Sequence, residues 1–151
     1  MDTLRRCLDA LVTDNLAHRF GLPDLAADPA MKAGGLHETA PGGFLKVHLD
    51  FNKLVATGKW RRLNLLLFLT PDWQEEWGGH LELWGGEPLE CKKKILPKFG
   101  RMVIFEASEH SWHGQPEPHT APVARRSMAL YYYSGEPHPS CDGKYHSTVY
   151  L

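Results

Sequence analysis

Cysteine is scarce in this chain of 151 residues. The three cysteines, Cys7, Cys91 and Cys141, are odd in number and far apart in the sequence. This pattern excludes a disulfide framework, and it lacks the paired spacing with which cysteines bind zinc. We therefore expect a reducing compartment of the cytoplasmic type.

An excess of charge of one sign and long hydrophobic runs are also missing. Lys and Arg number 17 against 18 Asp and Glu, which leaves a net charge of −1. This balance argues against a polyanionic partner such as nucleic acid, and the three lysines at 92–94 are too short a run to reverse that expectation. No stretch is long and apolar enough to span a membrane, and the N-terminus lacks the apolar run of a signal peptide. We expect neither a nucleic-acid nor a membrane partner.

The chain does contain enough apolar sequence for one folded core. Its apolar content is 42%, and its length predicts a single domain over residues 1–151. Leucines and other apolar residues recur at helical spacing over residues 3–20, and Gly21 marks the expected end of this helix. We expect a short helical lead-in over about residues 1–33, followed by a mainly β core over about residues 34–151.

Short strand-like segments fill most of the predicted core. The run at 61–70 is almost continuously apolar, which is typical of a strand buried on both faces. Seven or eight short strands separated by Gly and Pro turns predict a two-sheet jelly roll, a fold that holds small-molecule and metal sites at its mouth. The expected strands are 43–50, 61–70, 80–84, 92–96, 101–106, 111–114 and 127–134, with 36–39 and 146–150 as further candidates.

Two histidines and an aspartate form the most informative pattern. His48 and Asp50 stand two apart in a strand-like segment, so their side chains should point to one face. His113, in a later short strand, is the third candidate. His110 and His119 are also available, but their polar, proline-bearing surroundings predict that they are exposed. A His-x-Asp pair alone is usually an ordinary polar pair, whereas two histidines and one carboxylate can hold Fe(II) and leave positions open.

An arginine near the last long strand is a candidate for binding an anion. Arg125 and Ser127 share one strand face by alternation, and Arg126 lies on the other. An arginine can donate two parallel hydrogen bonds to one carboxylate, and a serine hydroxyl can add a third. The alternative is that both arginines are solvated at the start of the strand.

Four segments in order resemble the prolyl 4-hydroxylase-like branch of the iron(II)/2-oxoglutarate-dependent dioxygenase superfamily. The resemblance covers about residues 34–134, and the segments are GGFLKVHLDFN, RRLNLLLFLTPDWQEEWGGHLELW, ILPKFGRMVIFEASEHSWHG and RRSMALYYYS. It implies a double-stranded β-helix, or jelly roll, in which His48, Asp50 and His113 hold the iron and act in catalysis through it. It also implies that Arg125, assisted by Ser127, binds the distal carboxylate of 2-oxoglutarate, with Arg126 as the alternative.

The resemblance further implies the reaction. The expected cofactors are Fe(II), 2-oxoglutarate as cosubstrate and O₂, with ascorbate as a further candidate. The implied enzyme hydroxylates an unactivated C–H bond and releases succinate and CO₂; the substrate is a prolyl residue of a peptide or protein, or else a small molecule. Substrate-binding loops are expected at 53–59 and 116–124, with Trp60, Trp73 and Trp77 as an entrance or a packed rim. The segment 72–83 is expected to be structural.

Two departures from the family pattern leave another function class open. Residues 37–39 read His-Glu-Thr where many relatives carry a tyrosine, and Phe68 stands where tyrosine is usual. The alternative is therefore a non-catalytic jelly-roll module that binds metal and 2-oxoglutarate, and succinate formation would distinguish the two. A cupin-like enzyme is disfavoured because its site usually needs a His-x-His pair and a glutamate. The sequence indicates neither the individual substrate nor the oligomeric state.

Overall fold

The computed structural model describes residues 2–151, which begin with a helical stretch. The stretch comprises the α-helix α1 (Asp2–Ala10), a π-helical turn (Leu11–Leu16) and a 3₁₀ turn (Ala17–Phe20). Gly21 follows in the left-handed conformation, with φ of 66°, and ends it. The predicted helix over 3–20 is therefore confirmed in extent, although only its first half is regular α-helix.

The rest of the chain is built from antiparallel strands, with one 3₁₀ turn at Glu75–Trp77. Three of them have only two residues. Two of these three, Ala26–Ala27 and Lys53–Leu54, were not predicted, because pairing with a neighbouring strand defines them rather than their own sequence. The strands are β1 (Ala26–Ala27), β2 (Gly35–Thr39), β3 (Leu45–Leu49), β4 (Lys53–Leu54), β5 (Lys59–Phe68), β6 (Leu81–Gly85), β7 (Glu90–Ile95), β8 (Met102–Glu106), β9 (Trp112–Gln115), β10 (Arg125–Ser134) and β11 (Val149–Tyr150).

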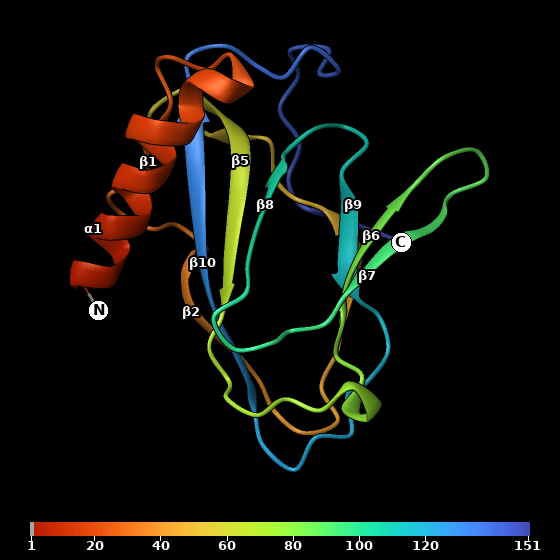
Figure 1. Ribbon diagram of the computed structural model, residues 1–151. Helices are drawn as coiled ribbons and strands as arrows, with labels where there is room; N and C mark the ends of the chain where they lie inside the picture. Colours follow the sequence, from red (N-terminus) through yellow and green to blue (C-terminus); the bar gives the residue numbers. More distant parts are fainter. Residues whose placement is uncertain (1) are drawn as a thin grey trace.

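The strands form two facing sheets (Figure 1). In the larger sheet β10 and β5 pair at the centre; β1 and β2 pair with β10, and β4 and β8 pair with β5. The smaller sheet has the order β11-β3-β9-β6-β7. This arrangement confirms the predicted mainly β jelly roll with an N-terminal helical segment.

The hydrophobic core lies between the larger sheet and the N-terminal helix. Leu63 and Leu65 of β5 are fully buried there, in one cluster with Leu8 and Val12 of the helical stretch. The helix covers the outer face of β10 and β5 (Figure 1), while the inner face of these strands looks toward the smaller sheet. Burial on both faces explains the almost continuous apolar run of β5.

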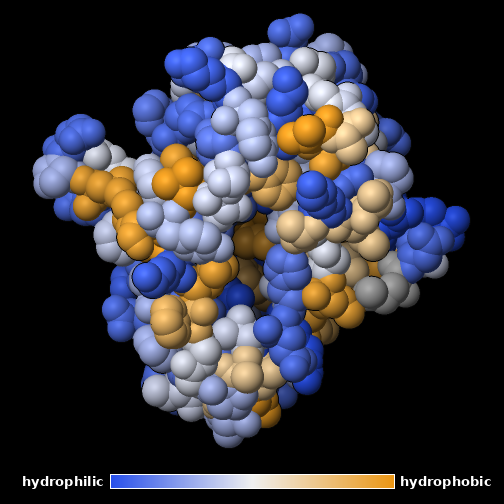
Figure 2. Space-filling model, turned by 180° about the vertical axis from the view of Figure 1, so that it is seen from behind, coloured by the Kyte–Doolittle hydropathy of each residue, from blue (hydrophilic) through white to orange (hydrophobic). Residues whose placement is uncertain are grey.

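The C-terminal segment returns from β10 to the smaller sheet. It crosses the top of the molecule in Figure 1 and ends as β11 against β3. Asn52 fixes it on the way, because its side chain donates to the Lys144 carbonyl at 2.9 Å and accepts from the His146 amide at 3.1 Å. The back face of the molecule is hollowed near its centre, with hydrophobic and hydrophilic residues side by side (Figure 2). Among residues 2–151, no helix is both long and apolar enough to cross a membrane.

Candidate metal and cosubstrate site

A cavity of about 250 Å³ lies between the two sheets. Strands from both sheets line it, and the C-terminal segment contributes Thr148 and Tyr150. The predicted metal ligands and the predicted cosubstrate residues all border this cavity except Arg126. The predicted metal ligands and the predicted cosubstrate residues Arg125 and Ser127 therefore border the same cavity.

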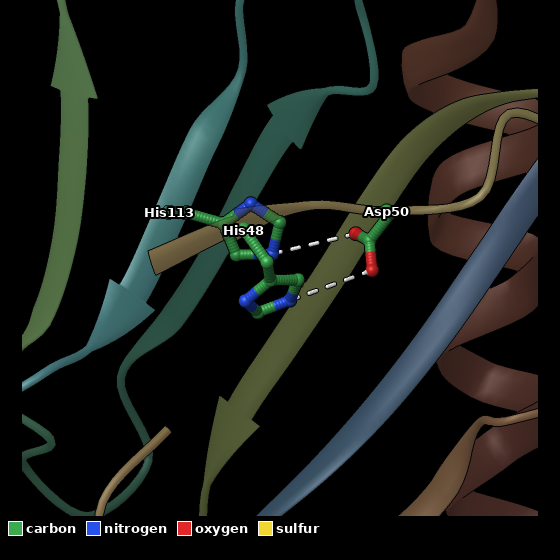
Figure 3. A group of neighbouring side chains, drawn as sticks. All are labelled: His48, Asp50 and His113. Carbon is green, nitrogen blue, oxygen red and sulfur yellow. Dashed lines mark ion pairs between the residues drawn. The ribbon is translucent and has the colours of Figure 1, made fainter. Parts of the chain in front are cut away.

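The three predicted metal ligands come together at the smaller sheet (Figure 3). His48 of β3 stands opposite His113 of β9 in register, and Asp50 follows directly after β3. The Nε2 atoms of His48 and His113 lie 3.7 Å and 3.3 Å from the two carboxylate oxygens of Asp50. One ligand atom from each residue lies within 4.8 Å of the others, which is close enough for all three to reach a single ion.

Backbone carbonyls fix the orientation of both histidines. Nδ1 of His48 donates to the Lys46 carbonyl at 2.8 Å, and Nδ1 of His113 donates to the Ser111 carbonyl at 2.9 Å. In this tautomer each Nε2 carries a free lone pair directed toward Asp50, as metal-binding histidines require. The sequence did not reveal these partners; each is the carbonyl two residues before the histidine.

The electrostatics keep His113 and Asp50 in the protonation states that bind metals. Burial lowers the pKa of His113 to about 4, so that its ring is neutral at pH 7. Burial by itself would raise the pKa of Asp50, but the Arg61 guanidinium and the two histidines outweigh it and hold this pKa well below its usual range. The neutral imidazole of His113 and the ionised carboxylate of Asp50, together with the His48 ring, fit Fe(II) in the two-histidine, one-carboxylate arrangement.

Arg125 occupies another part of the cavity and is buried. Its Nε donates to the Gly79 carbonyl at 2.8 Å, and its guanidinium lies 5.0 Å from the centre of the Phe68 ring. Burial lowers its pKa to about 10, and no carboxylate among residues 2–151 lies within ion-pair distance of it. A buried cation without a partner is poised to bind an anion.

The other arginine points away, as strand alternation predicts. Arg126 is exposed, and its Nε donates to Glu38 at 2.7 Å. Ser127, two residues beyond Arg125, is buried and borders the cavity. The structure therefore brings Arg125 and Ser127 to the cavity and leaves Arg126 outside it; the roles of all three residues in binding remain predictions.

The segment 72–83 positions Arg125 rather than serving only as a scaffold. Gly79, whose carbonyl accepts from Arg125, has φ of 70°, and a Cβ at this position would lie 2.9 Å from the Trp73 ring. Trp73 donates its indole N–H to the Gly78 carbonyl at 3.0 Å. The tryptophan and the two glycines together place the carbonyl that orients the arginine.

The structure corrects several sequence-based expectations about the surroundings of the site. His119 was expected to be exposed but is 1% exposed, because it packs on Trp73 and lies within 3.2 Å of the Thr39 carbonyl. His110 is exposed as predicted. Trp60 and Trp73 are buried, and none of the residues 53–59 and 116–124 is among the residues described as bordering the cavity. The interior tryptophans therefore pack rather than form an entrance.

The sequence analysis did not identify two groups of residues that border the cavity or support it. Thr148 and Tyr150 reach the cavity only because β11 pairs with β3, placing Tyr150 opposite His48. Arg61 and Asn64 of β5 lie behind Asp50, at 3.0 Å and 2.8 Å from its Oδ2. The paired arginines at the start of β5 were a possible signal, but strand alternation counted from Asn64 would have selected Arg62 instead.

A jelly roll with two histidines and one carboxylate facing its cavity defines the class of non-haem iron oxygenases. Residues 34–133 match the family model described as the 2OG-Fe(II) oxygenase superfamily. The chain belongs to this superfamily, which agrees with the resemblance found in the sequence and implies Fe(II), 2-oxoglutarate and O₂ as cofactors.

Prolyl hydroxylases are among the proteins that this chain resembles. The chain is 30% identical over 77 residues to prolyl 3-hydroxylase OGFOD1 of Mus musculus, a match covering 48% of this chain and 14% of that protein. A prolyl hydroxylase from Trichoplax adhaerens, solved with a peptide fragment of the hypoxia inducible factor oxygen degradation domain, has a TM-score of 0.53 and 26% identity over 66% of this chain and 42% of its own. A prolyl 4-hydroxylase structure from Phytophthora capsici shares the fold, with a TM-score of 0.52 and 23% identity over 85% of this chain and 39% of its own. The chain thus spans less than half of each relative.

Proposed function

We propose that this chain is an Fe(II)- and 2-oxoglutarate-dependent dioxygenase that hydroxylates a prolyl residue of a peptide or protein. One observation carries the proposal: the His48, Asp50 and His113 cluster and the unpaired Arg125 border the same cavity. A metal centre alone would fit many activities, and a buried arginine alone would fit any anion. Their combination is what an oxygenase with a dicarboxylate cosubstrate needs.

The three clustered side chains would hold the iron. Backbone carbonyls already orient His48 and His113, and Asp50 is held in its ionised form, so little rearrangement is needed on binding. When bound, iron supplies the activation of O₂ that couples oxidation of 2-oxoglutarate to succinate and CO₂ with insertion of one oxygen atom into a C–H bond. The protein supplies the orientation of the bound groups within the cavity.

Arg125 would bind the distal carboxylate of 2-oxoglutarate, with the Ser127 hydroxyl as an additional donor. The bond from Nε of Arg125 to the Gly79 carbonyl fixes the plane of the guanidinium and leaves both terminal nitrogens for a carboxylate. Because the site is buried, this ion pair would be screened little by solvent. The arginine would thus set the position of the cosubstrate.

The charges around the cavity favour joint binding of metal and cosubstrate. Arg61 and Asp50 balance each other as an ion pair, and Arg125 adds an uncompensated positive charge. A divalent cation raises the positive charge further, and a dicarboxylate then offsets part of it. We therefore expect each ligand to increase the affinity for the other.

We assign the substrate side of the cavity to Leu45, Thr148 and Tyr150, which border it. The Tyr150 ring lies 5.4 Å from the His48 ring, and 55% of the tyrosine is exposed. A neutral, largely apolar side chain such as proline suits this wall, and the relatives named above are prolyl hydroxylases. A peptide substrate is supported by the peptide bound to the Trichoplax adhaerens protein.

The test is turnover with proline-containing peptides. The protein would be incubated with Fe(II), 2-oxoglutarate, ascorbate and O₂, and both succinate and peptides heavier by one oxygen atom would be measured. His113→Ala should abolish both products, whereas His110→Ala, which changes an exposed histidine in the turn before β9, should retain them. Binding of metal and 2-oxoglutarate without either product across the panel would instead favour a non-catalytic binding module.

A further inference from the structure

A closed set of polar contacts lies behind the carboxylate of Asp50. Asn64 donates from Nδ2 to Oδ2 of Asp50 at 2.8 Å and accepts at Oδ1 from Nε of Arg61 at 2.7 Å. Nη2 of Arg61 approaches the same Asp50 oxygen at 3.0 Å, as an ion pair without hydrogen-bond alignment. Arg61 and Asn64 therefore both contact Oδ2, which also lies 3.3 Å from Nε2 of His113. The ion-pair contact of Oδ1 among the described residues is His48 at 3.7 Å, so Oδ1 has no contact with the arginine or the amide.

A β-bulge in β5 brings Arg61 into this set. Tyr132 of β10 pairs with Leu63, but the next residue, Tyr133, pairs with Arg61, so Arg62 is the extra residue in β5. One extra residue reverses the alternation of side chains beyond it. Arg61 consequently borders the cavity on the same side as Asn64, and Arg62 donates instead to Ser134 Oγ at 3.3 Å and the Glu136 carbonyl at 3.2 Å.

Aromatic rings hold the Arg61 guanidinium in place. Its central carbon lies 3.5 Å from the centre of the Tyr131 ring and 4.8 Å from that of Phe51. The arginine is 3% exposed. Stacking on one side and a hydrogen bond to Asn64 on another leave the planar group little freedom.

We propose that Arg61 and Asn64 are positioning residues that hold Asp50 by Oδ2, so that it offers Oδ1 to the metal as a single-oxygen ligand. This inference rests on the proposed iron site. Residues behind a metal-binding carboxylate fix its orientation, and their loss typically lowers metal affinity or activity about 10- to 100-fold. The β-bulge makes this contact possible. Without it, the alternation of side chains along β5 would turn Arg61 away from Asp50.

Repulsion between the Arg61 guanidinium and a bound cation predicts the opposite change in metal affinity. The variants below separate this effect from positioning. A guanidinium close to a metal site should weaken cation binding, so removal of its charge alone would tighten binding. Asn64 is neutral, and its removal tests orientation without changing charge. Arg61→Lys keeps the charge but loses the fixed fork of the arginine.

The experiment measures Mn(II) affinity by calorimetric titration and the visible spectrum of the Co(II)-loaded protein. The wild type is compared with Arg61→Met, Arg61→Lys and Asn64→Ala, and thermal unfolding checks that each variant folds. Arg62→Met is the matched control, because it removes a neighbouring, largely buried arginine that does not contact Asp50. His48→Ala reports loss of the metal site itself.

Positioning predicts that Arg61→Met and Asn64→Ala each bind Mn(II) about 10- to 100-fold more weakly. Arg61→Lys should also bind more weakly, and Arg62→Met should bind like the wild type. The Co(II) spectra of Arg61→Met and Asn64→Ala should change, because Asp50 becomes free to bind through both oxygens.

Unchanged or tighter binding by folded Asn64→Ala, or an equal loss in Arg62→Met, would overturn the positioning role while leaving the proposed iron site intact. Absence of binding in the wild type would overturn both. If Arg61→Met does not fold, Asn64→Ala and Arg61→Lys decide the question.

Discussion

Replacing Arg125 with methionine should leave the ligand-free protein at least as stable as the wild type while greatly weakening 2-oxoglutarate binding. Burial lowers the pKa of Arg125 from 12.5 to about 10. At about 1.4 kcal/mol for each pKa unit, keeping this charge in the folded protein costs about 3 kcal/mol. Loss of the bond to the Gly79 carbonyl offsets about 1–2 kcal/mol of the gain. The net expectation is a rise of about 1–2 kcal/mol in the free energy of unfolding.

The binding effect has the opposite sign. Removing one partner of a buried ion pair costs about 3–5 kcal/mol, so the Kd for 2-oxoglutarate should rise about a hundredfold or more. Chemical denaturation of the ligand-free protein gives the first quantity, and calorimetric titration of 2-oxoglutarate into the Mn(II)-loaded protein gives the second. Arg126→Met is the control, because its exposed pair with Glu38 contributes only about 0–1 kcal/mol to stability.

Two results would refute this reasoning. If Arg125→Met loses several kcal/mol of unfolding free energy and keeps its affinity for 2-oxoglutarate, Arg125 is a structural residue. A loss of affinity in Arg126→Met but not in Arg125→Met would show that the strand faces are assigned the wrong way round.

Three further predictions concern other parts of the site. Burial lowers the pKa of His113 from 6.5 to about 4. As the pH falls, the His113 side chain is therefore protonated in the unfolded chain before it is protonated in the folded protein. The metal-free protein should consequently lose up to about 3 kcal/mol of stability between pH 6.5 and pH 4. Denaturation at several pH values measures this, and an equal slope in His113→Asn would contradict it. Tyr150→Ala should raise the KM for a proline-containing peptide without changing Mn(II) affinity, with Tyr150→Phe as the control; an unchanged KM would remove Tyr150 from the substrate wall. Gly79→Ala should destabilise the fold by about 1–3 kcal/mol in thermal unfolding, because its φ is positive and its Cβ would lie 2.9 Å from Trp73; wild-type stability would show that this turn is not constrained.

Local sequence patterns were sufficient to predict those features of the fold and the site that depend on a single strand. The apolar run of β5 predicted burial on both faces, because the helix covers one face and the cavity lies at the other. The spacing of His48 and Asp50 predicted a shared direction, and their side chains do converge with His113. Alternation along β10 likewise separated Arg125 from Arg126.

Features that depend on two strands could not be predicted from either one. The bulge at Arg62 exists only in the register between β5 and β10, so alternation within β5 would have sent Arg61 to the wrong face. Tyr150 reaches the cavity through its pairing opposite His48. His119 was wrongly expected at the surface, because its polar neighbours in the sequence gave no sign of the Trp73 ring that packs against it.

The most direct test of the central claim is the visible absorption of the protein after Fe(II) and 2-oxoglutarate are added without oxygen, followed by a succinate assay once air is admitted. If one cavity holds both ligands, the wild type should develop the absorption band of 2-oxoglutarate chelated to iron and should then form succinate, most rapidly with a proline-containing peptide present. Asp50→Ala should give neither signal. A wild-type protein that is folded but gives neither band nor succinate would contradict the assignment of this cavity as an oxygenase site.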